Sequence, residues 1–300
     1  MEPKIMKMLI TGITGFLGRH LCAYYAGQNG VDLFGTGRSA HPHVELPGNA
    51  EYLQADITNR EEILTVLDKI QPDVIIHTAA MSSPNVCEVE QDLTRKVNVD
   101  ATRYLAEWAK EHGAHFLHLS TDFVFGDHGP FSEEDTYGPV NFYGQSKVEA
   151  EQAIMETGGR WAIIRPVLIY GYAYAGGHGS FPQWVKGELE AGNHIRVFTD
   201  QYRTATYVDD LVWGIDQIIR KEKTGKWHLC GPGIITPYHF ALQIAVHLGL
   251  DQNLISPVTS GEMQELAKRP VHSTLHISKA QNELGFSPVF TDEGLKKTFK

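Results

Sequence analysis

The feature that most constrains the fold is a glycine-rich turn directly after the first apolar run of the chain. That run is Met8–Thr11, and the next residues read Gly12-Ile13-Thr14-Gly15-Phe16-Leu17-Gly18 before a helical pattern that reaches Gln28. Gly12 permits a tight turn, Gly15 lets the backbone approach a pyrophosphate, and Gly18 lets the helix pack closely on the strand. The start of such a helix offers unpaired N–H groups and a partial positive charge. The pattern predicts a dinucleotide-binding turn, with an ordinary strand-to-helix turn as the alternative. The expected cofactor contacts are Gly12, Thr14, Gly15, Phe16, Leu17 and Gly18.

Further apolar runs follow at Val74–Thr78, Phe116–Ser120 and Ala162–Val167. None alternates cleanly between apolar and polar residues, which is typical of strands buried on both faces of a parallel sheet. Helical patterns lie between the runs, at Arg60–Ile70 and at Val97, Ala101, Leu105 and Trp108. Alternating strands and helices predict an α/β fold of the Rossmann type, with a doubly wound parallel sheet covered by helices.

The pattern changes after Val167, which suggests a second region. Residues 1–166 with about 204–226 are expected to form the dinucleotide-binding Rossmann domain, including a helix at Asp209–Arg220. Residues of about 167–203 with 227–300 are expected to form a smaller mixed α/β region that binds substrate. Between them, Tyr170–Ser180 is rich in Gly and Tyr, and it is either a plain linker or a lid over the substrate.

The overall charge and the cysteines limit the classes of partner and compartment. The formal net charge is −10, which disfavours a nonspecific grip on nucleic acid or on an anionic membrane. Cys22, Cys87 and Cys230 are far apart and form no paired motif, which fits a reducing compartment. No signal peptide and no apolar stretch of 18 residues is recognisable. We therefore expect a soluble cytoplasmic protein that binds neither nucleic acid nor membrane.

The histidines raise the question of a metal site. His112, His115 and His118 form the closest cluster, but the odd spacing of His115 and His118 along a strand places them on opposite faces. Neither a His-Glu-x-x-His motif nor paired-cysteine spacing is present. We therefore predict no metal site, and we expect His77, which ends a strand, to be a buried and hydrogen-bonded histidine.

The end of the second strand favours one cofactor over another. An acidic residue there would bind the ribose hydroxyl of NAD, but the run Phe34–Ser39 contains none. Arg38 can instead pair with a 2′-phosphate, aided by the Ser39 hydroxyl, so NADP is predicted over NAD. A surface arginine in a turn is the alternative. Asp56 and Ile57, which follow a third short strand, are placed to meet the adenine unless Asp56 only caps the next helix.

Two residues one helical turn apart suggest acid–base chemistry. Tyr143 and Lys147 lie on one face if residues 142–156 form a helix. A phenol is a poor acid–base group at neutral pH, and a cation about 6 Å away would lower its pKa by about two units. Thr121, with Ser120 as second choice, ends a neighbouring strand and can hold a reacting carbonyl oxygen. Strand-end capping is the alternative for Thr121.

Together these residues resemble the extended short-chain dehydrogenase/reductase family, and within it most closely the dTDP-4-dehydrorhamnose reductases. The stretches that carry the resemblance are the glycine turn, His77-Thr78-Ala79-Ala80, Asn98, Ser120 to Phe125, Pro139 to Lys147, Asp200-Gln201, Thr206 to Leu211 and Arg269-Pro270. The resemblance implies a catalytic triad of Thr121, Tyr143 and Lys147. It also implies cofactor contacts at Ala79, Ala80, Asn98, Tyr143 and Lys147.

Two departures bear on the reaction that the resemblance implies. The related 4,6-dehydratases have Asp-Glu after the catalytic threonine, whereas Asp122 is followed by Phe123, which cannot move a proton. The stretch Met81–Glu88 also differs from the rhamnose-pathway reductases, which leaves the sugar open. Substrate contacts are expected at Ser82, Thr121, Asp122, Arg203 and Arg269, the two arginines matching those that hold a pyrophosphate in the family. A surface salt bridge is the alternative for each arginine.

The reaction implied by the resemblance is reduction, by NADPH, of a keto group on a nucleotide-activated deoxysugar. A nucleotide-sugar epimerase and a non-catalytic, dinucleotide-binding regulatory subunit are the alternatives. The presence of Thr121, Tyr143 and Lys147 together favours an enzyme. Many members of the family are dimers, so a homodimer is one assembly that the resemblance allows.

Overall fold

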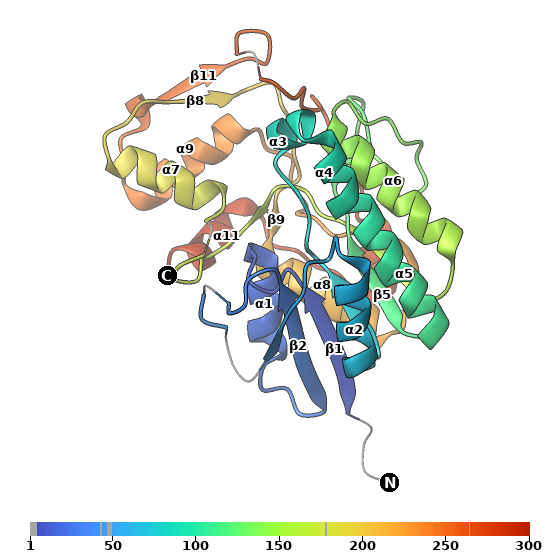
Figure 1. The fold of residues 1–300 in the computed structure, drawn as a ribbon. Coiled ribbons are helices and arrows are strands. Elements are labelled where there is room, and N and C mark those ends of the chain that lie inside the picture. Colours follow the sequence, from blue (N-terminus) through green and yellow to red (C-terminus); the bar gives the residue numbers. More distant parts are fainter. Residues whose placement is uncertain (1–4, 43, 47–49, 178, 264) are drawn as a thin grey trace.

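A computed structural model of the chain describes residues 5–42, 44–46, 50–177, 179–263 and 265–300. Its centre is a seven-stranded, wholly parallel sheet with the strand order β10-β6-β5-β4-β1-β2-β3 (Figure 1). The strands are β1 (Met6–Thr11), β2 (Val31–Gly37), β3 (Glu51–Gln54), β4 (Val74–His77), β5 (His115–Leu119), β6 (Trp161–Arg165) and β10 (Gly225–His228). The direction of winding reverses between β1 and β4, and a parallel sheet binds ligands beyond the carboxyl ends of its strands at such a point. The predicted doubly wound Rossmann-type fold is confirmed.

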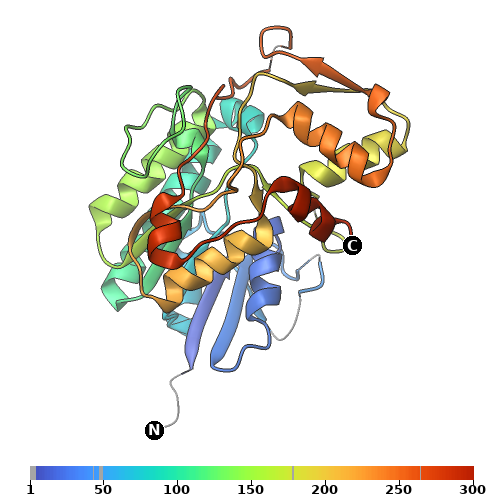
Figure 2. The ribbon, with the colours of Figure 1, turned by 180° about the vertical axis from the view of Figure 1, so that it is seen from behind.

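Two layers of helices cover the sheet, one on each face (Figures 1 and 2). One layer contains α1 (Phe16–Tyr25), α8 (Val208–Arg220) and α10 (Ser278–Leu284), and the other contains α2 (Arg60–Ile70), α5 (Ala101–His112) and α6 (Phe142–Thr157). In β1, Met8 and Ile10 enter the core of the first layer, whereas Leu9 enters the core of the second. Both faces of the strand are therefore apolar, which explains why the run shows no alternation.

A smaller unit is built on the carboxyl side of the sheet. It contains α7 (Phe181–Glu190), α9 (Pro237–Leu248), α11 (Thr291–Thr298) and a parallel pair of strands, β8 (Ile195–Phe198) and β11 (Ile255–Val258). These elements share their own apolar core, to which Val185, Ile195 and Phe240 contribute. A second short parallel pair, β7 (Ile169–Tyr170) and β9 (Thr206–Tyr207), lies where the chain passes between the two units. Across from the smaller unit lie α3 (Pro84–Val89) and α4 (Gln91–Arg95) (Figure 1).

The two units are less separate in sequence than expected. Strand β10 extends beyond residue 226, at which the Rossmann domain was expected to end, and pairs with β6 at the edge of the main sheet. Helix α10 packs its Ala280 and Leu284 into the core shared with β1 and α8. The carboxyl-terminal part of the chain therefore crosses back over the main sheet before it ends in the smaller unit (Figure 2).

The connector after β7 contacts α1 through residues 172–175. Arg19, which is buried, donates to the carbonyl oxygens of Tyr174 (3.1 Å) and Ala175 (3.0 Å). The ring of His20 adds a hydrogen bond with the carbonyl of Tyr172 (3.0 Å). Within the described ranges, no helix combines the length and the apolar character that crossing a bilayer requires.

Candidate active site

The glycine turn joins β1 to α1 at the carboxyl edge of the sheet. Gly12 has a φ of +69°, and a Cβ built there would lie 2.9 Å from the backbone nitrogen of Ala79. A Cβ on Gly18 would overlap the carbonyl oxygen of Gly12. Gly15 is the N-cap of α1; no described side chain bonds to that end of the helix, and its first turn contains no acidic residue. The N–H groups at the start of α1 are therefore left for an anion, so the turn fits a dinucleotide pyrophosphate.

The other predicted contacts of the turn differ in exposure. Thr14 and Phe16 are partly exposed beside Gly15, whereas Leu17 is buried in the core. The side chain of Leu17 packs with the residues of α8 and β1, so only its backbone faces the turn.

Arg38 and Ser39 follow β2 at the same edge of the sheet, and both side chains are exposed. Their backbone is held by β3, because the Gln54 amide donates to the carbonyl of Arg38 (3.0 Å) and the Tyr52 hydroxyl donates to the carbonyl of Ser39 (2.9 Å). A fixed backbone with exposed side chains suits a ligand that approaches from solvent.

Asp56 follows β3, and it does not cap the next helix. Its Oδ1 accepts from the backbone N–H (2.9 Å) and the hydroxyl (2.8 Å) of Thr58, whereas the N-cap of α2 is Asn59. The alternative of a helix cap at Asp56 is therefore wrong. Ile57 is buried in the core beneath this edge.

His77 ties the end of β1 to the start of α5. The Thr102 hydroxyl donates to the carbonyl of Asn98 (2.7 Å), so it accepts from Nε2 of His77 (3.1 Å), and the Thr11 hydroxyl lies 2.7 Å from Nδ1. Burial, with a smaller effect of the charge on Lys147, lowers the pKa of His77 to about 3, so its ring is neutral. The expectation of a buried, hydrogen-bonded histidine is confirmed.

Asn98 lies in a single π-helical turn, Lys96–Asp100, which leads into α5. Its Oδ1 accepts from the backbone N–H of Met81 (2.8 Å), and its Nδ2 donates to the carbonyl of Met81 (3.0 Å) and to the hydroxyl of Ser146 (3.0 Å). The amide thus joins the loop after β4 to α6. π-helical turns are often found at functional sites.

The loop that Asn98 holds carries three of the predicted contacts. Ala79 is partly exposed, and Ala80 and Ser82 are exposed, so all three are open to a ligand. Cys87 is buried below them, with its thiol 3.5 Å from the carbonyl of Met81, and burial raises its pKa.

Thr121 and Tyr143 come together at the carboxyl end of β5. The Thr121 side chain accepts from the backbone N–H of Phe123 (3.2 Å), and it is near enough to the Tyr143 phenol to lower the pKa of that group. The Phe123 ring meets the Tyr143 ring edge-on, with 5.8 Å between their centres. The start of α6 is fixed by Asn141, whose side chain accepts from the N–H of Gly144 (2.8 Å). The site can therefore present two hydroxyl groups to one carbonyl oxygen.

The electrostatics of Tyr143 differ from the prediction. Burial raises its pKa well above that of a free phenol, the hydrogen bond with Thr121 opposes this, and the charge on Asp122 adds to it. The amine of Lys147 instead donates to Nε2 of His118 (2.9 Å) and to the carbonyl of Leu119 (2.7 Å). The prediction that Lys147 lowers the phenol pKa is thus wrong in this structure, because desolvation dominates and the amine is directed into the sheet.

Asp122 contacts the carboxyl-terminal segment through Ser273. Its carboxylate accepts hydrogen bonds from the hydroxyls of Thr121 (3.1 Å) and Ser273. Burial raises its pKa, and the charge on Arg203 opposes that effect. Asp122 therefore fixes the segment around Ser273 against the end of β5.

Arg203, predicted to contact a pyrophosphate or to lie in a surface salt bridge, is buried. Its guanidinium donates to the carbonyl oxygens of Tyr202 (2.8 Å) and Pro270 (2.8 Å). Arg269 is partly exposed nearby, and its Nε lies 2.7 Å from a carboxylate oxygen of Glu265. Of the two arginines, Arg269 is the more accessible to a ligand.

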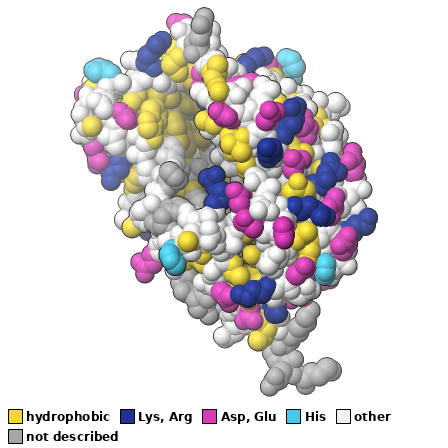
Figure 3. Space-filling model, viewed as in Figure 1, with side chains coloured by type: hydrophobic (Ala, Val, Ile, Leu, Met, Phe, Trp, Pro, Cys, Tyr) yellow, Lys and Arg dark blue, Asp and Glu magenta, His cyan; other side chains and the backbone are white. Residues whose placement is uncertain are grey.

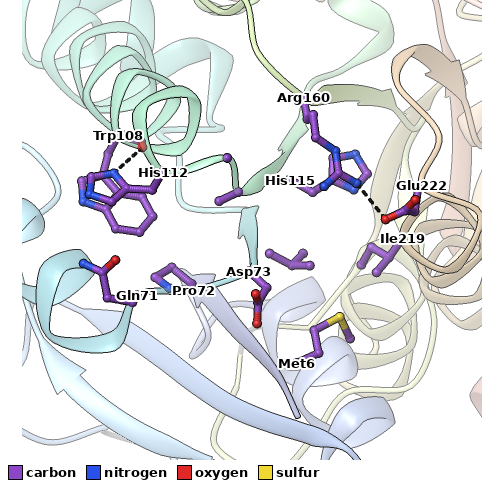
Figure 4. A pocket seen from close by; sticks show the side chains of 13 residues that line it. Met6, Gln71, Pro72, Asp73, Trp108, His112, His115, Arg160, Ile219 and Glu222 are labelled. Atoms are coloured by element: carbon purple, nitrogen blue, oxygen red, sulfur yellow. Dashed lines mark hydrogen bonds and ion pairs between the residues drawn. The ribbon is translucent and has the colours of Figure 1, made fainter. Parts of the chain in front are cut away.

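Two hollows differ in their relation to these residues. The surface is hollowed between the smaller unit and the part that carries α3, and apolar side chains gather there (Figure 3). Another hollow, of about 560 Å³, lies at the opposite edge of the sheet, where Met6 and His115 begin their strands (Figure 4). Because ligands of open parallel sheets bind beyond the carboxyl ends of the strands, the second hollow has no place in the chemistry proposed below.

The comparison with known families agrees with this geometry. A model of the RmlD substrate binding domain matches residues 6–300. The chain belongs to the RmlD substrate-binding domain family. The resemblance to dTDP-4-dehydrorhamnose reductases is confirmed across the whole chain.

The relatives of this chain include a reductase and a subunit of a methionine adenosyltransferase. The dTDP-4-dehydrorhamnose reductase of Aggregatibacter actinomycetemcomitans is 30% identical over 306 residues, which cover 97% of this chain and 97% of that protein. Methionine adenosyltransferase 2 subunit beta of Pongo abelii is 29% identical over 282 residues, covering 92% of this chain and 81% of that protein. The crystal structure of dTDP-4-dehydrorhamnose reductase from Bacillus anthracis in complex with NADP has a TM-score of 0.84 and 27% identity, covering 98% of both chains.

Three residues to which the sequence analysis assigned no role in the site support it in this RmlD-family chain. His118 binds the amine of Lys147, Glu151 is buried one turn beyond that lysine, and Gly144 allows α6 to approach the turn after β5. A Cβ on Gly144 would overlap the carbonyl oxygen of Phe123. The sequence offers one signal for two of these residues: Gly144 and Glu151 interrupt an otherwise regular helical pattern in residues 142–157.

Proposed function

We propose that this chain reduces the keto group of a nucleotide-activated deoxysugar, with NADPH as the reductant. The observation that carries the proposal is that Thr121 and Tyr143 come together at the carboxyl end of β5, on the same edge of the sheet as the glycine turn. The relatives that are reductases of sugar nucleotides support the same reaction class.

The cofactor would be held by the glycine turn, the start of α1 and the exposed pair Arg38 and Ser39. When bound, NADPH supplies a hydride to the carbonyl carbon. Arg38 would pair with the 2′-phosphate, which favours NADP over NAD. The complex of the Bacillus anthracis reductase with NADP supports that preference.

The protein residues would supply the proton and hold the oxygen. Tyr143 has a raised pKa and is therefore protonated at neutral pH, which is the form that a proton donor needs. The Thr121 hydroxyl, which donates to Asp122 (3.1 Å) in this structure, would give up that bond to donate to the same oxygen and polarise the carbonyl. Lys147 would contact the nicotinamide ribose, and the third amine proton remains for that contact.

Substrate would occupy the hollow between the two units (Figure 3). Ser82 is exposed in the loop before α3, and the segment that carries Arg269 contacts α3, because the Ala267 N–H donates to Asn85 Oδ1 (3.1 Å). Arg269 would hold the pyrophosphate, whereas Arg203 and Asp122 would fix the segment that carries it. The experiment is a panel of 4-keto nucleotide sugars, including dTDP-4-dehydrorhamnose, followed by the loss of NADPH absorbance. One NADPH consumed for each sugar reduced is the expected result, whereas sugar conversion without net NADPH loss would indicate an epimerase.

The similarity to methionine adenosyltransferase 2 subunit beta favours one alternative, a dinucleotide-binding regulatory subunit. Such a subunit would bind NADPH but would oxidise it with no keto sugar nucleotide. Failure of the whole panel, together with NADPH binding in the micromolar range or tighter, would favour that alternative over the reductase.

A further inference from the structure

The amine of Lys147 is held in a fixed position inside the sheet. The side chain is 1% exposed, and Nζ donates to Nε2 of His118 (2.9 Å) and to the carbonyl of Leu119 (2.7 Å). An ammonium group has three donors, so β5 accepts from two of them and the third has no partner within β5. The placement of that last donor therefore depends on its two partners in β5.

His118 has no evident structural reason to be a histidine. Its ring is 1% exposed and packs against the rings of His77 and Phe116, with 5.3 Å and 6.3 Å between ring centres. Nε2 accepts from the ammonium, so the ring proton is on Nδ1, and Nδ1 has no hydrogen-bond partner among the described residues. A buried donor without a partner costs free energy that an apolar side chain would avoid.

We propose that His118 is a positioning residue for the reduction, whose Nε2 holds the Lys147 amine so that its remaining N–H is directed at the cofactor and its charge is retained. This inference rests on the proposed function for its catalytic meaning. The carbonyl at position 119 belongs to the backbone, so any residue there would supply it. Of the two acceptors, only Nε2 of His118 depends on the identity of the side chain. A neutral histidine also suits this role better than a carboxylate, which would compete with the cofactor for the amine.

The charge on Lys147 depends on few groups. Burial lowers the pKa of its amine to about 7, and the Glu151 carboxylate, one turn further along α6, opposes that effect. His118 and His77 face it from β5 and β4, and burial keeps both rings neutral by lowering their pKa values. Because an acceptor stabilises the charged form, removal of Nε2 lowers the pKa of Lys147 further, so the ammonium is lost at a lower pH.

Two substitutions of His118 separate positioning from packing. His118→Leu fills the apolar surroundings but has no acceptor, whereas His118→Gln offers an amide oxygen near the place of Nε2. We expect the alkaline limb of the pH profile of kcat to move about one pH unit lower in His118→Leu, with turnover reduced about tenfold at pH 8 and less at pH 6. His118→Gln should restore the position of the limb. An unchanged profile in His118→Leu, or equal damage in both variants, would overturn the proposal.

A second measurement does not need turnover. In protein labelled with ¹⁵N-histidine at pH 6, the His118 signal, assigned by its loss in His118→Gln, should show a protonated Nδ1 and an unprotonated Nε2.

NADPH binding, followed by fluorescence between pH 6 and 9, should weaken at a lower pH in His118→Leu than in the unmodified protein. A protonated Nε2 at pH 6, or identical binding curves, would contradict the inference even if no sugar is reduced. Absence of reduction with these two results intact would refute only the proposed function.

Discussion

Arg165 and Glu151 form an ion pair in which neither side chain is exposed to solvent. Nη2 of Arg165 lies 2.6 Å from Oε2 of Glu151, and Nε lies 3.0 Å from Oε1. The same carboxylate accepts from the hydroxyls of Ser120 (2.5 Å) and Tyr137 (2.8 Å). Because Ser120 precedes Thr121 and Glu151 lies one turn beyond Lys147, the pair joins α6 to β5 and β6 directly below the candidate site.

Glu151→Gln should destabilise the protein by about 3–5 kcal/mol, because it leaves the Arg165 guanidinium buried without a compensating charge. Urea denaturation measures the change in the free energy of unfolding. The matched control is Glu222→Gln, which removes an exposed pair with Arg160 (3.1 Å) beside the hollow of Figure 4. Exposed pairs contribute at most about 1 kcal/mol, so equal losses in the two variants would refute this account.

Gly18→Ala should abolish tight NADPH binding and lower the melting temperature, because its Cβ would overlap the carbonyl oxygen of Gly12 and displace the turn. Gly187→Ala is the control: Gly187 lies inside α7, no atom within 4 Å would meet its Cβ, and its φ is not positive. Alanine in a helix interior is favoured over glycine by about 0.5–1 kcal/mol, so this variant should be slightly more stable. Calorimetry and fluorescence titration with NADPH compare the two, and normal cofactor binding by Gly18→Ala would contradict the role of the turn.

Tyr143→Phe should lower kcat by about 10²–10⁴, because it removes the proton donor from the site. The Kd for NADPH should change by less than a factor of about three, since the ring remains in place and one hydrogen bond contributes little to the whole complex. Tyr104→Phe, on α5 away from the site, is the control and should retain full turnover. Stopped-flow measurement of NADPH oxidation under single-turnover conditions gives the chemical step directly. A rate close to that of the unmodified protein would exclude Tyr143 as the donor.

Arg38→Ala should reduce kcat/KM for NADPH by about 10–100-fold and leave that for NADH nearly unchanged, since a charge-assisted contact contributes about 1.5–3 kcal/mol. Arg103→Ala is the control, because Arg103 is on α5 and pairs only weakly with Glu156 (3.8 Å). Steady-state kinetics with both dinucleotides measure the ratio. If the ratio of kcat/KM for NADPH to kcat/KM for NADH is the same in Arg38→Ala and in the unmodified protein, the 2′-phosphate is bound by another residue.

The fold was predictable because its signals are local. In β1, successive side chains enter two different apolar cores, so the strand is an unbroken apolar run in the sequence. Helix α2 spans the predicted Arg60–Ile70, because its buried residues recur at helical spacing. Strand β10 was not predicted, since Gly225–His228 is short and contains polar residues, and only its pairing with β6 makes it a strand.

The candidate site was predictable as a set of residues but not as a set of contacts. Helical spacing places Tyr143 and Lys147 on one side of α6, yet it cannot say that β5 offers the lysine a nearer acceptor at His118. The burial of Arg203 could not be predicted for the same reason. Its partner, the carbonyl of Pro270, is 67 residues away in the sequence. Contacts between distant segments depend on the assembled fold, and spacing along one segment carries no information about them.

The buried histidines whose pKa values are lowered, which are His77, His115, His118 and His228, should make the protein lose stability in mild acid. Burial lowers the pKa values of His77 and His228 to about 3 and that of His115 to about 4, whereas an unfolded histidine has a pKa of about 6.5. Between these values the unfolded state binds more protons than the folded state, so the stability is fully present above pH 6.5 and falls as the pH decreases toward 4. From pH 7.5 to pH 5.5 each histidine accounts for a loss of about 1.4 kcal/mol, and His77, His115 and His228 together for about 4 kcal/mol.

Urea denaturation at several pH values tests this, with His115→Phe as the variant, because His115 lines the hollow of Figure 4 and its replacement leaves the candidate site untouched. The slope of the unfolding free energy against pH should decrease by one proton between pH 6 and 4.5 in His115→Phe. His194→Gln is the control, since His194 is exposed and the slope should stay as in the unmodified protein. Equal slopes in all three proteins would mean that His115 is protonated in the folded state. Its ring would then be hydrated in the hollow and not buried in the neutral form.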